Sequence, residues 1–255
     1  MCISVLKYTI KVKIKLKIFG DNFLFFKMFG LNSFVSTIED LLKKDFTFTN
    51  FIADLDRSSI CLRHDIDFSV KEAYKIALIE KDMGIKANYF FMLSSNTYNP
   101  LSNENRYYIE KISNLGHEIS LHFDPSIYDD VDGFFVKEKE FFENIFSVKI
   151  YIVSLHRPRK FLEDNNRKLK GCYHTYEDKF FKNMEYLSDS AGRDIRSNLQ
   201  RIMPTNQEKP LHILIHPIWW TIESSDPTYT LNNWLKEQND FLISEIARNC
   251  RTYKK

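Results

Sequence analysis

Residues that break or cross-link a fold are scarce in this chain. It has 7 glycines and 7 prolines among 255 residues, with no linker, low-complexity stretch or internal repeat, so the sequence predicts one domain. Its four cysteines lie far apart and form no CxxC pair. That spacing disfavours a disulfide or zinc framework and is typical of reduced thiols, which predicts a cytoplasmic protein.

Other common signals are also missing. Lysine and arginine number 36 against 34 aspartates and glutamates, a net charge of +2, so no charge excess favours nucleic acid or acidic membranes as partners. No run of about 18 apolar residues supports an integral membrane segment. The glycine-rich phosphate loops GxGxxG and GxxxxGKS/T are absent, as is the GxSxG turn of a serine nucleophile. We therefore expect a small or neutral ligand and no nucleic acid.

The first residues follow a pattern of their own. Between residues 11 and 18, lysine alternates with valine, leucine or isoleucine, which is the period of an amphipathic strand and not of a signal peptide. Three interpretations stay open: an extra edge strand, a membrane-surface segment, or translated sequence upstream of a true start at Met28. We treat residues 1–31 as an appendage and residues 32–255 as the folded domain.

Beyond that segment, helical and strand periods alternate. A capping box begins one helix, with Ser69 followed by Glu72. Strands that alternate with helices form a parallel sheet, so we predict an α/β fold, with a barrel and an open doubly wound sheet both allowed. The predicted helices cover residues 33–44, 69–84, 103–115, 131–146 and 229–248, and the predicted strands cover residues 59–66, 87–93, 117–123, 148–155, 171–174, 185–187 and 211–215.

One stretch places charged groups at the end of a predicted strand: Arg63-His64-Asp65-Ile66-Asp67. Side chains alternate between the two faces of a strand, so Arg63, Asp65 and Asp67 share one face and His64 points to the other. Two acids on one face need a cation or a shared proton. Because the active groups of parallel α/β folds gather at the carboxyl ends of the strands, this stretch predicts a functional site.

Later strands end in residues of the same kind. They supply His122 and Asp124, then His156 and Arg157, and later Asp189 and His216. Histidine nitrogens and carboxylate oxygens suit zinc or another divalent first-row metal. Such a metal activates a water while a carboxylate acts as base and a histidine as acid. The strand ends therefore predict metal-assisted hydrolysis of an amide or ester.

In this order, the stretches resemble the motifs of the polysaccharide deacetylases of the NodB-homology superfamily, and most closely a divergent branch linked to surface-polysaccharide biosynthesis. The resemblance implies a distorted (β/α) barrel of one domain and a metal-dependent hydrolase of carbon–nitrogen bonds. The implied substrate is an acetylated amino sugar or a surface-glycan precursor. The motifs are LRHDID at 62–67, GHEISLHFD at 116–124, SLHRP at 154–158, LSDS at 187–190 and LIHPIWW at 214–220.

The resemblance implies roles for three catalytic residues. Asp65 matches the general base, His216 the general acid, and Arg157 the arginine that orients the base. Asp189 falls near the carboxylate of the fourth motif and is expected on the substrate side, as is Asp124.

The implied metal is zinc, with cobalt, nickel or iron as alternatives. His122 matches one ligand. Ile66 stands where the family has its ligand aspartate, directly after the base, so the metal role is carried one residue further to Asp67. Ser126 stands where the family has a second histidine ligand. The third ligand must then come from His156, our first choice, or from Asp124 or His64, or the metal is absent.

Two tryptophans and two histidines complete the expectations. Trp219 and Trp220 follow His216, and their flat faces suit sugar rings as well as a packing role. His117 is expected to be a packing and hydrogen-bonding residue, and His64, which faces away from the two acids, is a weaker ligand candidate than its neighbours. Two other functions stay open: hydrolysis of a non-sugar amide or ureide on the same scaffold, and a non-catalytic glycan-binding relative.

Overall fold

Parallel strands form the centre of the molecule. The computed structural model describes residues 29–163, 167–202 and 208–254. In this part of the chain, eight strands form one sheet. Seven of them pair in the order β6-β5-β4-β3-β2-β8-β7, and every neighbouring pair is parallel. The remaining strand, β1, pairs with the start of β2, while β3 pairs with its end. The strands are β1 (Thr47–Thr49), β2 (Ser59–Ile66), β3 (Asn88–Phe91), β4 (Glu118–Phe123), β5 (Ile152–Leu155), β6 (Tyr173–His174), β7 (Glu185–Ser188) and β8 (Leu211–Ile215).

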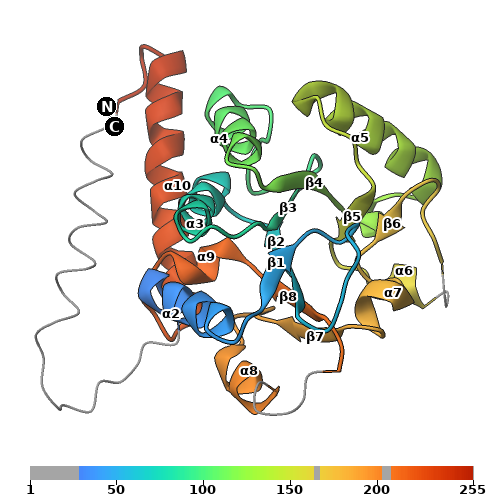
Figure 1. Cartoon of the computed structure of the whole chain (residues 1–255). Helices are drawn as coiled ribbons and strands as arrows, with labels where there is room; N and C mark the ends of the chain where they lie inside the picture. The colour runs from blue at the N-terminus through green and yellow to red at the C-terminus, as the bar shows by residue number, and fades with distance from the viewer. Residues whose placement is uncertain (1–28, 164–166, 203–207, 255) are drawn as a thin grey trace, which may run out of the picture.

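Helices cover the outside of this sheet (Figure 1). The longer ones are α2 (Leu31–Leu42), α3 (Val70–Asp82), α4 (Asn103–Asn114), α5 (Val131–Phe146) and α10 (Pro227–Asn249). Shorter turns follow several strand ends: the 3-10 helix η1 (Pro125–Ile127), α6 (Arg159–Leu162), α7 (Asp178–Phe181), α8 (Arg196–Ile202) and α9 (Pro217–Trp220). The strand ends therefore lead directly into short turns that can hold side chains in place.

Local sequence signals explain where α3 begins and ends. The hydroxyl of Ser69 accepts a hydrogen bond from the backbone N–H of Glu72 at 3.3 Å, which satisfies a donor that the first turn leaves free. Gly84 follows the helix with φ of +73°, a conformation that a residue without a Cβ adopts freely. The helix thus returns the chain to the sheet at β3.

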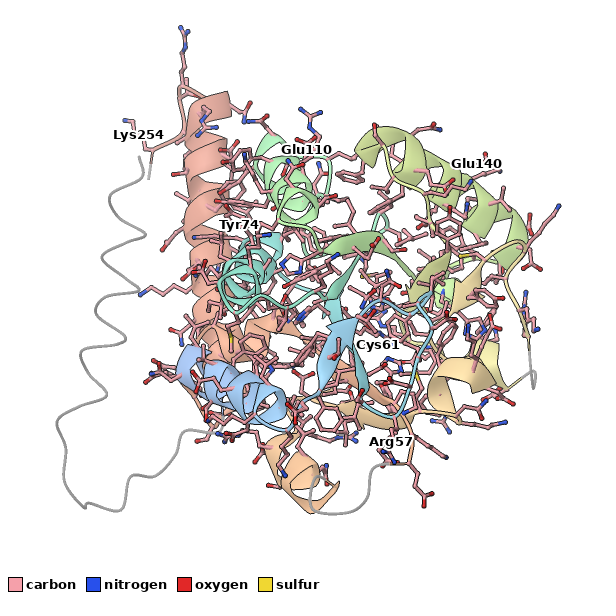
Figure 2. All side chains as sticks on the ribbon, viewed as in Figure 1. Arg57, Cys61, Tyr74, Glu110, Glu140 and Lys254 are labelled. Carbon is pink, nitrogen blue, oxygen red and sulfur yellow. The ribbon has the colours of Figure 1, made fainter. Side chains whose placement is uncertain are left out.

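The two faces of the sheet pack against different surroundings. Ile60 and Leu62 of β2 belong to a large apolar cluster shared with the helices. Cys61 lies on the other face, in a smaller cluster with Phe51 and Phe90. Figure 2 shows side chains filling the space around Cys61 on β2, in the middle of the molecule. Alternation along β2 therefore separates an outer core from an inner one.

The sheet curls into a half-barrel. In the strand order, β3, β4 and β5 separate β2 from β6. Even so, the guanidinium carbon of Arg63 on β2 lies 4.9 Å from the ring centre of Tyr176, two residues beyond β6. The ring of Tyr176 also lies 6.4 Å from that of Tyr186 on β7, so the two ends of the strand order approach each other.

The predicted α/β fold with a (β/α) barrel is confirmed, with differences in detail. β1 and the short helices were not predicted, because segments this short do not show a repeating pattern of apolar residues in the sequence. β5 begins at Ile152 and not at residue 148, since the backbone N–H of Ile150 is held by the Glu143 carboxylate of α5 at 2.8 Å.

The folded domain also begins earlier than residue 32. Phe29 is 3% exposed, and its ring lies 5.1 Å from that of Trp220. The three interpretations of the N-terminal segment concern residues 1–28, which lie outside the described residues. In the described part of the chain, no helix is both long enough and apolar enough to cross a membrane.

Candidate functional site

The predicted strand-end residues converge at one rim of the half-barrel. Asp65 comes from β2 and His122 from β4. Asp67, His156 and His216 are the residues directly after β2, β5 and β8. A ring nitrogen of each of the three histidines lies within 3.7 Å of a carboxylate oxygen of Asp67. The parallel strands therefore bring together groups that lie up to about 150 residues apart in sequence, as strand ends in such folds do.

Arg63 holds the carboxylate of Asp65 with two parallel hydrogen bonds. Its Nε donates to Oδ1 at 2.8 Å and its Nη2 to Oδ2 at 2.6 Å. Arg63 is fully buried and Asp65 is 3% exposed. Burial raises the pKa of Asp65, but the charges of Arg63 and His122 lower it by more, to about 2. Asp65 is therefore an ionised, oriented carboxylate at neutral pH.

Asp67, His122 and His156 form a compact set of three donor atoms. His122 Nε2 lies 3.2 Å from Asp67 Oδ1 and 3.2 Å from His156 Nδ1, and His156 Nδ1 lies 3.4 Å from Asp67 Oδ1. Two atoms bound tetrahedrally to one zinc ion at about 2.0–2.1 Å lie about 3.3–3.4 Å apart. The buried Asp67 Oδ1 has no hydrogen-bond partner in the described structure. The three residues therefore fit a divalent metal.

Ser154 fixes the ring of His122. The Ser154 hydroxyl lies 2.5 Å from His122 Nδ1, and the pair is buried between β4 and β5. Because that contact occupies Nδ1, the Nε2 atom is left facing Asp67. Burial raises the pKa of Asp67, yet the adjacent imidazoles of His122 and His156 lower it well below its ordinary value.

Tyr98 and Thr97 hold the backbone on which the two aspartates stand. The Tyr98 hydroxyl donates to the carbonyl of Ile66 at 2.8 Å, and the Thr97 hydroxyl donates to the carbonyl of Asp67. The backbone N–H of Met92 in turn donates to the Tyr98 hydroxyl at 2.8 Å. The loop after β3 thus fixes the end of β2, including the Ile66 that separates the two acids.

Asp189 positions His216. Its Oδ1 lies 2.6 Å from His216 Nδ1, and both carboxylate oxygens accept from the backbone N–H of His216 at 2.9–3.0 Å. The Trp220 indole donates to Oδ2 at 2.7 Å. Burial lowers the pKa of His216, but the charge of Asp189 raises it by more, to about 9. His216 is therefore protonated at neutral pH, with its Nε2 3.7 Å from Asp67 Oδ2.

Several expected roles do not match the geometry. Arg157 is exposed and, in the described chain, has no contact with Asp65. Arg63, two residues before the base on the same strand, takes the place expected for it. Asp189 is fully buried and reaches His216 instead of a substrate. The expected substrate-side Asp124 is 3% exposed and caps η1 by accepting from the N–H and hydroxyl of Ser126 at 2.9 and 2.6 Å.

Both tryptophans are also turned inward. Trp220 is fully buried, between Phe29 and Phe34, and Trp219 is 6% exposed. The turn of α9 directly after His216 points them into the core, so neither offers an open ring face for a sugar. This corrects the substrate-side expectation for Trp219 and Trp220.

His117 lies away from the rim, as expected, and so does His64, one of the possible third ligands. His64 Nε2 contacts Glu80 at 2.6 Å, and the Tyr89 hydroxyl donates to the same carboxylate at 2.5 Å. His117 Nδ1 lies 3.2 Å from the backbone nitrogen of Ala87. These groups are buried between β2, β3 and α3, so His64 is not a ligand for the metal set.

Comparison with known proteins finds similar solved structures only at low identity. No family model matches the chain, and no curated protein does. BA3943 of Bacillus anthracis, described as a CE4 family pseudoenzyme, is 16% identical over 70% of this chain and 60% of its own, with a TM-score of 0.40. A BA3943 mutant described as having restored enzymatic activity is 18% identical over 71% of this chain and 63% of its own, with a TM-score of 0.41. This chain thus spans less than two thirds of the length of either.

Two further structures cover more of their own length. The peptidoglycan deacetylase PdaC of Bacillus subtilis is 14% identical over 74% of this chain and 96% of its own, with a TM-score of 0.43. The catalytic domain of peptidoglycan N-acetylglucosamine deacetylase from Eubacterium rectale is 12% identical over 74% of this chain and 89% of its own, with a TM-score of 0.42. Proteins named as deacetylases and a protein named as a pseudoenzyme thus both stand among the similar structures.

Proposed function

We propose that this protein is a metal-dependent hydrolase that removes an acetyl group from an amino sugar or surface-glycan precursor. One observation carries the proposal: the donor atoms of Asp67, His122 and His156 lie 3.2–3.4 Å from one another, the spacing of ligands around a single zinc ion. A paired carboxylate and a protonated histidine flank this set. Together they match the base, ligands and acid that the motif resemblance implies.

In this proposal His156 replaces the second histidine of the β4 motif, where this chain has Ser126. It directly follows β5, the strand that pairs with β4, and its Nδ1 lies 3.2 Å from His122 Nε2. A divalent metal held there would polarise the acyl oxygen and lower the pKa of a bound water. Zinc suits the two nitrogens and one oxygen, and cobalt, nickel or iron share this preference.

The acid and the base have opposite protonation states at neutral pH. Asp65 is ionised because Arg63 holds it, and it would take a proton from the attacking water. His216 is protonated because Asp189 holds it, and it would give a proton to the departing amine nitrogen. Environments that shift the pKa values of two titrating groups in opposite directions are typical of catalytic acid–base pairs.

The direct test is acetate release from N-acetylglucosamine oligomers and from N-acetylglucosamine 1-phosphate by zinc-supplemented protein. We expect turnover in the wild type and loss of about 100-fold or more in Asp65→Asn and His216→Ala, with circular dichroism unchanged. Asp124→Asn is the matched control, because it alters a buried carboxylate that caps η1 and not the acid–base pair. Near-normal turnover in both site variants, or no acetate from any substrate at any metal loading, would reject the proposal. The latter result would favour a glycan-binding protein.

A further inference from the structure

Arg157 is left without a partner beside the metal set. It directly follows His156, it is exposed, and no hydrogen bond or ion pair involves its side chain in the described chain. Its backbone has φ of +46°, which is uncommon for a residue with a side chain and costs free energy. Since Arg63 already holds Asp65, orienting the base does not explain Arg157.

Three other cations lie in the segments that follow His156 and Asp189. Arg159 and Lys160 begin α6, two and three residues beyond Arg157, and Arg193 lies in the turn between β7 and α8. The backbone N–H of Arg193 donates to the carbonyl of Asp189 at 3.1 Å, which places this turn next to His216. All three are exposed and form no ion pair within the described residues. We call Arg157, Arg159, Lys160 and Arg193 the basic edge.

The basic edge is confined to one side of the rim. It follows β5, which pairs with β6 at one end of the strand order, and β7, which stands at the other end. The contact between Tyr176 and Tyr186 brings these two ends together. The loop after β4 carries the exposed acids Asp129 and Asp130 instead. A nearly neutral chain therefore carries four exposed cations, without an ion pair among the described residues, in the segments that follow His156 and Asp189.

We propose that the basic edge binds an anionic oxygen group, a phosphate or a carboxylate, on the acetylated sugar. This inference rests on the proposed function and names its substrate class. Arginine presents planar, two-pronged donors that match phosphate and carboxylate oxygens. A cationic clamp would also offset the repulsion that Asp65 and Asp67 exert on an anionic substrate. A neutral glycan polymer would leave all four cations without a ligand.

Binding measured without turnover tests the proposal independently of catalysis. Chelator-treated full-length protein would be titrated by calorimetry with N-acetylglucosamine, N-acetylglucosamine 1-phosphate and 2-acetamido-2-deoxyglucuronic acid. We expect one of the two anionic sugars to bind with at least about 10-fold higher affinity than the neutral sugar. Which of the two binds more tightly shows whether the basic edge prefers a phosphate or a carboxylate. Arg157→Gln should abolish most of that preference. Arg106→Gln, which removes the same charge from exposed α4, should preserve it.

The outcomes separate the two proposals. Equal affinity for the neutral and anionic sugars, or an Arg157→Gln variant that weakens both alike, would overturn the role of the basic edge even if acetate is released. An anion preference that depends on Arg157 would support the edge even if no substrate is deacetylated. Raising the ionic strength should reduce the preference in the wild type and leave the neutral sugar unaffected.

Discussion

The guanidinium of Arg63 and the carboxylate of Asp65 face each other on one strand, joined by hydrogen bonds of 2.8 and 2.6 Å. Both residues belong to β2, whose alternation places them on the same face two positions apart. The strand that presents the candidate base therefore also supplies the cation that holds it. Because Arg63 already holds the base, Arg157, the arginine expected to orient it, is left exposed to solvent.

Removing the guanidinium of Arg63 should destabilise the fold as well as the site. Arg63→Met leaves a buried, unpaired carboxylate, and breaking a buried pair costs about 3–5 kcal/mol of the free energy of unfolding. Adding Asp65→Asn to that variant should recover part of the loss, because no buried charge is then left unpaired. Urea unfolding of the wild type, both single variants and the double variant measures this coupling. Additive losses would show that the two residues do not interact as described.

Asp189 should control the protonation of His216. In Asp189→Asn the carboxylate charge is lost, so we expect the pKa of His216 to fall from about 9 towards the ordinary value of about 6.5. Proton NMR of the histidine ring in metal-free protein follows this titration. Asp124→Asn should leave it unchanged, since Asp124 contacts η1 and not His216. A His216 titration that is the same in wild type and Asp189→Asn would contradict the pairing.

His212 should make the fold sensitive to acid. It is fully buried in β8, with Nδ1 2.9 Å from the carbonyl of Phe180, and burial with the nearby charge of Arg63 lowers its pKa to about 3. The unfolded chain binds this proton below pH of about 6.5 and the folded chain does not. The free energy of unfolding should therefore fall by about 1.4 kcal/mol per pH unit from this residue between about pH 6.5 and 3.

A variant that cannot titrate isolates this contribution. His212→Asn keeps an N–H donor for the Phe180 carbonyl but has no acidic pKa in this range. Its stability should therefore depend less steeply on pH than that of the wild type, by about 2–3 kcal/mol between pH 6.5 and 4.5. Equal pH slopes in urea unfolding would rule out His212 as the source.

The alternation of strands and helices was sufficient to predict which residues meet. Asp65, Asp67, His122, His156 and His216 all follow the rule that the carboxyl ends of parallel strands share one rim. The choice of His156 as third ligand candidate also agrees with its place in the cluster. Side chains alternate between the two faces of a strand with a period of two, so the sequence alone shows which residues share a face.

The direction of side chains beyond the strand ends could not be predicted in the same way. Trp219 and Trp220 lie in a single helical turn whose orientation depends on packing against Phe29 and Phe34, which come from the start of the domain. Ser154 aligns with His122 only through the register of β4 and β5. Such pairings are tertiary, so no local pattern reveals them.

Metal content is the most direct test of the account. Protein purified with zinc in excess and then dialysed should retain about one metal ion per chain by mass spectrometry of the metals. His156→Ala and His122→Ala should each lose it, while His64→Ala, which alters a buried histidine away from the rim, should retain it if the variant folds. Full retention of metal in His156→Ala and His122→Ala, or no metal in the wild type under these conditions, would contradict the site formed by Asp67, His122 and His156.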